Sequence, residues 1–163
     1  MAKKQSKSKT LPIHILNGPN LNLLGSREPA IYGTATLGDV QKACAVRAKK
    51  YGFAILFKQS NKEGELVEFI QAARGKASAV IINAAAYTHT SVAVLDALKV
   101  LEIPVMEVHL SNPARREDFR HKSYVAMGAT GSITGLGLNS YLLAIDAVAT
   151  LLQEKSIIKG KTS

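Results

Sequence analysis

Short apolar runs alternate along this chain with longer segments of helical period. The runs predict five strands, at 12–16, 53–58, 79–82, 104–108 and 132–135. The segments between them predict helices at 36–52, 63–74, 91–101 and 139–152, with a helical turn at 117–122. Thr36 and Asp39 have the spacing of a capping box, which marks the start of the first helix. This alternation is typical of a parallel sheet with helices on both faces.

Five strands joined by right-handed crossovers predict one α/β domain with the common strand order 2-1-3-4-5. Ligands of such sheets bind beyond the carboxyl ends of the strands, near the switch point between the first and third strands. The loops after the first, third and fourth strands, at 17–33, 83–90 and 109–120, are rich in polar residues. The strand order 2-1-3-4-5 places these three strands side by side, so their loops would meet at one cleft. The segment 59–61, after the second strand, is short and shows no candidate chemistry.

Most of the formal net charge of +9 lies at the ends of the 163-residue chain. We therefore divide it into a basic tail at 1–10, a single domain at 11–153 and a basic tail at 154–163. The domain holds 14 basic and 11 acidic side chains, a net charge of +3. Because a polyanion groove needs its basic residues in the folded body, we expect solubilising tails and no nucleic-acid partner.

Other classes of protein are excluded by what the sequence lacks. No stretch reaches the ~18 apolar residues that span a bilayer, and the first ten residues lack the apolar segment of a signal peptide. We therefore expect a cytoplasmic protein with no membrane partner. The single Cys44 rules out an internal disulfide or a multi-thiolate zinc site. Neither a phosphate-binding loop nor a nucleophile elbow is present.

The loop at 17–33 frames Asn20, Arg27 and Tyr32 between glycines and prolines. A permanent arginine cation favours a nearby tyrosinate, so Tyr32 is a candidate base if the site is closed and poor in water. The alternative is a packing aromatic with a hydrogen-bonded hydroxyl.

The other two loops carry neutral donors, a histidine and arginines. Asn83 and His89 suit substrate hydroxyl groups. Strand alternation puts Glu107 and His109 on one side, where the carboxylate would orient the imidazole as a general acid. A substrate anion would meet donors just beyond, at Leu110, Ser111 and Arg120. On the alternative interpretation, the polar residues of the loop at 83–90 only cap the next helix and His89 is a surface imidazole. The loop at 109–120 would then be an arginine-rich surface turn.

Together these segments closely resemble the type II 3-dehydroquinases. The match runs over about residues 12–152 and includes ILNGPNLNLLG, REPAIYG, NAAAYTHTS, EVHLSN and REDFR. The resemblance implies a flavodoxin-like, three-layer α/β fold and the dehydration of 3-dehydroquinate to 3-dehydroshikimate in the shikimate or quinate pathway, with no cofactor. The family often has proline or glycine where this chain has Ala84 and Ala85.

The resemblance also implies catalytic roles. Tyr32 would remove a C2 proton to form an enolate, and Arg27 would stabilise the tyrosinate. His109 would protonate the departing C1 hydroxyl, and Glu107 would tune His109. Asn20 would hold a water against the enolate oxygen.

Substrate binding and assembly follow from the same resemblance. Asn83, His89 and Arg120 would bind substrate oxygens, and the amides of Leu110 and Ser111 would bind its carboxylate. Arg116 would be a second cation near the base. Asp96 matches a family residue that reaches the active site of a neighbouring subunit. The implied assembly is a homododecamer, built as a tetramer of trimers. From the local sequence alone, Asp96 would pair with Lys99.

Three alternative functions differ in what they predict. A flavodoxin-like binding module would bind a ligand without turnover. A nucleic-acid-binding protein would lose its affinity for nucleic acid when both tails are removed. Dehydration through a Schiff base would need Lys58 or Lys99, and neither lies among the loop motifs.

Overall fold

The computed structural model describes residues 10–26 and 28–161. The side chains of Tyr32 and of residues 158–161 also lie outside this description. Among the sequence predictions, the role of Arg27 and nearly all of the N-terminal tail therefore fall outside the described residues.

Five parallel strands form one sheet in the order β2-β1-β3-β4-β5, which confirms the predicted topology. They are β1 (Ile13–Asn17), β2 (Ile55–Gln59), β3 (Ala79–Asn83), β4 (Val105–His109) and β5 (Gly131–Thr134). Every residue of β1, β3 and β4 is buried, because these inner strands are covered on both faces. This burial explains why their sequences are largely apolar; the polar exceptions, themselves buried, are His14, Asn17, Asn83, Glu107 and His109.

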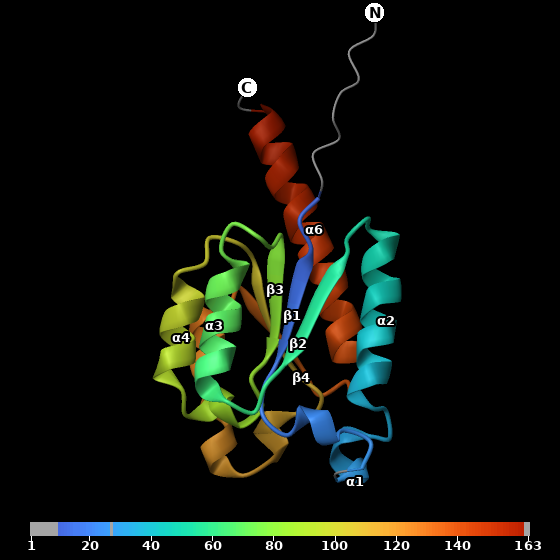
Figure 1. The fold of residues 1–163 in the computed structure, drawn as a ribbon, viewed down its shortest axis with the longest axis vertical. Coiled ribbons are helices and arrows are strands. Elements are labelled where there is room, and N and C mark those ends of the chain that lie inside the picture. Colours follow the sequence, from blue (N-terminus) through green and yellow to red (C-terminus); the bar gives the residue numbers. More distant parts are fainter. Residues whose placement is uncertain (1–9, 27, 162–163) are drawn as a thin grey trace, which may run out of the picture.

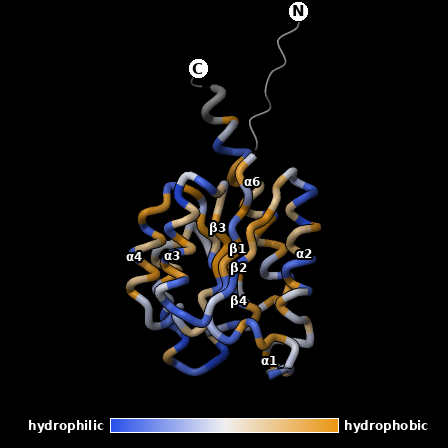
Figure 2. Tube along the Cα trace, in the orientation of Figure 1, coloured by the Kyte–Doolittle hydropathy of each residue, from blue (hydrophilic) through white to orange (hydrophobic). Residues whose placement is uncertain are grey.

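Helices cover both faces of the sheet (Figure 1). The helices α2 (Leu37–Lys50) and α6 (Asn139–Lys161) lie on one face, and α3 (Glu63–Ala73) and α4 (Val92–Lys99) lie on the other. Each face has its own buried apolar cluster, and the hydrophobic stretches of the strands lie between the helical layers (Figure 2). The short helix α1 (Pro29–Tyr32) lies at the carboxyl edge of the sheet, whereas α5 (Tyr124–Gly128) packs against α4.

The predicted elements are present, with boundaries that differ by a few residues. The capping box of Thr36 and Asp39 forms at the start of α2, and the hydroxyl of Ser91 caps α4. The last helix, however, continues to Lys161 instead of ending at 152. Nothing between these positions breaks a helix, since the segment has no proline, and its final turns extend past the sheet (Figure 1).

Several one-turn elements were not predicted. The loop at 17–33 contains the 3-10 helix η1 (Leu21–Leu23) and α1, and residues Ala85–His89 form the 3-10 helix η2. The turn η3 (Pro113–Arg115) was not predicted either, whereas η4 (Asp118–Arg120) is the helical turn expected at 117–122. Elements this short leave no hydrophobic period to recognise. Within the described part of the chain, no helix is long and apolar enough to cross a membrane.

Candidate active site

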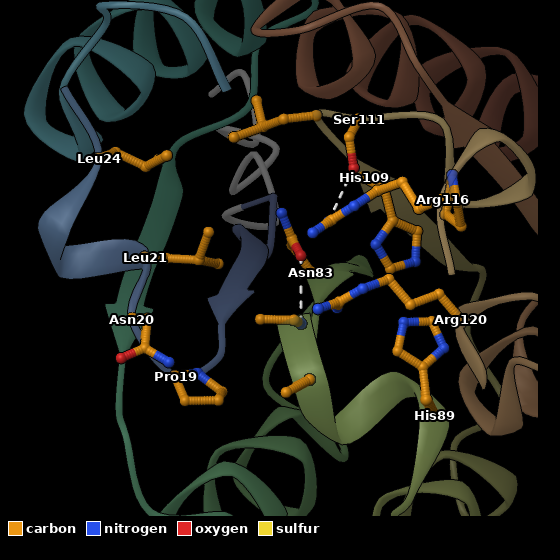
Figure 3. A pocket seen from close by; sticks show the side chains of 14 residues that line it. Pro19, Asn20, Leu21, Leu24, Asn83, His89, His109, Ser111, Arg116 and Arg120 are labelled. Atoms are coloured by element: carbon orange, nitrogen blue, oxygen red, sulfur yellow. Dashed lines mark hydrogen bonds between the residues drawn. The ribbon is translucent and has the colours of Figure 1, made fainter. Parts of the chain in front are cut away.

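A pocket lies where β1, β3 and β4 end, which confirms that the three predicted loops converge (Figure 3). Figure 3 shows Asn20, Leu21 and Leu24 on one side and the two histidines and two arginines across from them. The pocket brings together eight of the predicted site residues: Asn20, Asn83, His89, His109, Leu110, Ser111, Arg116 and Arg120.

His109 and Glu107 form a buried pair beside this pocket. Nε2 of His109 lies 2.9 Å from Oε1 of Glu107, as strand alternation predicted. Burial by itself raises the pKa of Glu107, but hydrogen bonds from His109, Ser123 and Ser132 outweigh that effect and leave the pKa below its usual range. Glu107 is therefore an anion at neutral pH and holds the His109 ring in one orientation.

His89 lies next to His109, with the two ring centroids 6.3 Å apart and the planes inclined by 17°. Its Nδ1 donates to the backbone oxygen of Lys122 over 2.7 Å, which leaves Nε2 as an acceptor in the neutral ring. Burial lowers the pKa of His89, the hydrogen bond to the backbone of Lys122 opposes this shift, and the charge of Arg120 adds to it. The neutral ring of His89 is thus suited to accept a hydrogen bond from a substrate hydroxyl through Nε2.

Asn83 forms the floor of the pocket and is held from behind. Its Nδ2 donates to the hydroxyl of Tyr141 on α6 over 2.9 Å, and its Oδ1 accepts from the backbone nitrogen of Ala85 over 3.2 Å. The Tyr141 hydroxyl in turn donates to Oδ1 of Asn17 over 2.7 Å. This chain of donors fixes which end of the Asn83 carboxamide points in each direction.

Two guanidinium groups bring positive charge to the pocket. Nε of Arg120 lies 2.8 Å from a carboxylate oxygen of Glu117, and Nε of Arg116 lies 3.7 Å from the same carboxylate. Nη1 of Arg116 also reaches Oγ of Ser111 at 3.5 Å. Because Glu117 is exposed and the arginines are partly buried, the pocket favours an anionic ligand.

The family model of class II dehydroquinases matches residues 11–149. The chain belongs to this family. That membership makes it an enzyme of the carbon–oxygen lyase class.

Similar proteins agree with this assignment. The 3-dehydroquinate dehydratase of Maricaulis maris is 60% identical over 143 residues, which cover 88% of this chain and 98% of that protein. Among solved structures, the type II dehydroquinase of Propionibacterium acnes aligns with a TM-score of 0.82 and 43% identity, over 88% of this chain and 97% of the other. That of Butyrivibrio crossotus aligns with a TM-score of 0.84 and 38% identity, over 86% and 99%.

In this dehydroquinase fold, the segment after β2 contributes more than its sequence suggested. The backbone nitrogen of Asn20 donates to Oδ1 of Asn61 over 2.9 Å, and Nε2 of Gln59 reaches the same oxygen at 3.1 Å. The hydroxyl of Tyr87 donates to the backbone oxygen of Asn61 over 2.8 Å. Asn61 therefore ties the loop after β1 to that after β3. The available signal was its position, since β2 neighbours β1 in the sheet.

Some predicted residues do not join the pocket. Asp96 is exposed on α4 and does not line it. Among the described residues, no ion pair joins Asp96 to Lys99, so the structure does not support the local alternative. The side chain of Tyr32 falls outside the described residues. Its backbone ends α1, close in sequence to Ile31 and Gly33, which line a hollow beside Ser111 and Arg116.

Proposed function

We propose that this chain dehydrates 3-dehydroquinate to 3-dehydroshikimate, with a tyrosinate as base and a histidine as general acid. The observation that carries the proposal is the buried Glu107–His109 pair, which faces a cationic pocket in a member of the class II dehydroquinase family. The activity would serve the shikimate pathway, which leads to chorismate and the aromatic amino acids, or the quinate pathway, and we expect it in the cytoplasm.

The proposed reaction is an anti elimination in two proton transfers. Tyrosinate 32, stabilised by Arg27, takes a proton from C2, and the electrons of that C–H bond form an enolate. A water held by Asn20 donates a hydrogen bond to the enolate oxygen. The enolate then collapses and breaks the C1–O bond, while His109 donates the proton that turns the leaving hydroxyl into water. A proton returns from Tyr32 to His109 through solvent before the next turnover.

The pocket supplies binding groups that match this substrate. Asn83, His89 and Arg120 would bind its hydroxyl oxygens, and the backbone amides of Leu110 and Ser111 would bind its carboxylate. Arg116 would add a second cation beside the base. These roles are supported by one observation: the three side chains, the two residues with the amides, and Arg116 all line the same pocket. No cofactor takes part in the proposed chemistry.

Turnover tests the proposal directly. The conjugated product absorbs in the ultraviolet, so purified protein mixed with 3-dehydroquinate should give rising absorbance. Tyr32→Phe and His109→Asn should each reduce kcat by about 10²- to 10⁴-fold, since each removes a proton-transfer group. Lys58→Ala should keep normal turnover, because a Schiff-base mechanism is not involved. A folded wild-type protein that binds the substrate without turnover would support a binding module instead.

The proposed assembly is a homododecamer, built as a tetramer of trimers, in which Asp96 reaches the pocket of a neighbouring subunit. Its support is that Asp96 is exposed on α4 and lies outside the pocket of its own subunit. Two inactive variants, Asp96→Asn and His109→Asn, test this when they are dissociated and reassembled together. Mixed oligomers should recover activity, because some pockets receive both native residues. Sedimentation as a monomer, or no recovery in mixed oligomers, would contradict the assembly.

A further inference from the structure

Two serine hydroxyls lie against the carboxylate behind His109. Oγ of Ser123 donates to Oε1 of Glu107, and Oγ of Ser132 donates to Oε2, each over 2.5 Å. Neither serine lines the pocket of Figure 3. Together with His109, they give the Glu107 carboxylate three hydrogen-bond donors.

Both hydroxyls are placed by the fold so that their protons point to Glu107. Ser132 on β5 is the direct cross-strand partner of Glu107 on β4, so its side chain lies on the same face of the sheet. Ser123 is the N-cap of α5, and its oxygen accepts from the backbone nitrogen of Ala126 over 2.9 Å. Because that lone pair is occupied, the hydroxyl proton of Ser123 is available to the carboxylate.

Glu107 needs such donors because it is only 2% exposed. A buried carboxylate without partners would take up a proton. The ionisable groups around it are His109 on its own strand, His89 from η2, and Arg120 and His121 from the segment that begins at η4. These groups are positive or become so on protonation, and of them only His109 contacts the carboxylate.

We propose that Ser132 and Ser123 are positioning residues for the dehydration: they keep Glu107 ionised, so that His109 stays aligned by a charged acceptor. The proposal deepens the proposed function and rests on it. It adds two residues that never touch substrate and act through Glu107 on the proton donor.

Ser132→Val and Ser132→Thr form a matched pair for the test. Valine and threonine have nearly the same shape and both suit a strand, but only threonine keeps the hydroxyl. In Ser132→Val, we expect the Glu107 carboxyl to titrate about one pH unit higher, followed by ¹³C NMR of the ligand-free protein. The low-pH limb of the kcat profile should move up by the same amount, with KM unchanged, and Ser132→Thr should behave as wild type.

Ser123→Ala should give the same shift, with Thr36→Ala as its control. Thr36→Ala also loses a helix cap, at α2 and away from Glu107, and should leave the pH profile unchanged. Ser78→Ala, which loses one hydroxyl bond to the backbone oxygen of Leu11, controls for the simple loss of a serine.

The outcomes separate this inference from the proposed function. Equal Glu107 titration in wild type and Ser132→Val would overturn the positioning role, as would a change in KM with kcat unaffected. Absence of turnover in the wild type would overturn the proposed function, while the carboxyl titration would still decide whether the serines hold Glu107 ionised.

Discussion

The hydroxyl of Tyr141, on the last helix, accepts a 2.9 Å hydrogen bond from the carboxamide of Asn83 at the end of β3. Tyr141 is completely buried, and burial raises its pKa, so the phenol keeps its proton and donates it to Asn17. The orientation of Asn83 in the pocket is therefore set by a residue 58 positions further along the chain.

Removing this hydroxyl should affect binding more than chemistry. In Tyr141→Phe, the Asn83 amide loses its acceptor and can rotate, so we expect KM to rise several-fold with a smaller change in kcat. The free energy of unfolding should fall by about 1–3 kcal/mol, because buried polar groups lose partners. Steady-state kinetics and urea unfolding check both effects. Tyr51→Phe is the control, since its hydroxyl bonds Asp146 on the α2–α6 side. Equal KM values in both variants would contradict the role of Tyr141.

Asn61 should prove important for turnover although it does not line the pocket. Asn20 has a φ of 67°, in the left-handed region, and its backbone nitrogen is held by the Asn61 side chain. Asn61→Ala should release this loop and reduce kcat about tenfold, which corresponds to about 1.4 kcal/mol. Asn61→Asp keeps the acceptor oxygen and should recover most of the activity. Similar losses in both variants would show that the hydrogen bond to Asn20 is not the cause.

Gly18 is required for close packing between the loops after β1 and β3. A Cβ at this position would lie 2.3 Å from the backbone oxygen of Ala84, and backbone cannot move aside as a flexible side chain can. Gly18→Ala should therefore lower the free energy of unfolding by about 1–3 kcal/mol and reduce activity. At Gly64 of α3, a Cβ would meet open space, so Gly64→Ala should be neutral or slightly stabilising. Thermal melts of the two variants make the comparison, and equal stability would contradict it.

His14 should make the protein less stable in mild acid. Burial lowers its pKa below the ordinary 6.5, the charge of Lys58 lowers it further, and a hydrogen bond to the backbone of Lys76 opposes the shift. Below pH 6.5 the unfolded chain therefore binds more protons than the folded one, and stability falls as the pH drops toward the lowered value.

The variant His14→Gln separates this effect from those of other groups. Glutamine keeps a donor but does not titrate, so its free energy of unfolding should change less than that of wild type between pH 6.5 and 5. The difference can reach about 1.4 kcal/mol per pH unit for one proton. Urea unfolding at several pH values measures it. Parallel curves for the two proteins would show that His14 does not titrate on unfolding.

The sequence indicated much of the site because its signals are local. The alternation of β4 was enough to pair Glu107 with His109, and the order of polar loops was enough to place Asn20, Asn83 and Arg120 at one cleft. Serines 123 and 132, Asn61 and Tyr141 were missed, since each acts on a residue that is distant in sequence. Their side chains carry no pattern that distinguishes them from ordinary caps, loop residues and core aromatics.

The sequence by itself determined most of the strands and helices, the helix caps, the family and the side chains available for chemistry. These features depend on hydrophobic periodicity and short motifs, which can be read within one segment of the chain. Only the tertiary structure decided which hydroxyls reach the Glu107 carboxylate, which way the Asn83 amide points, and that the last helix continues to Lys161. Those outcomes depend on hydrogen bonds between distant segments and on packing space, because a donor finds its acceptor only after the sheet has brought them together.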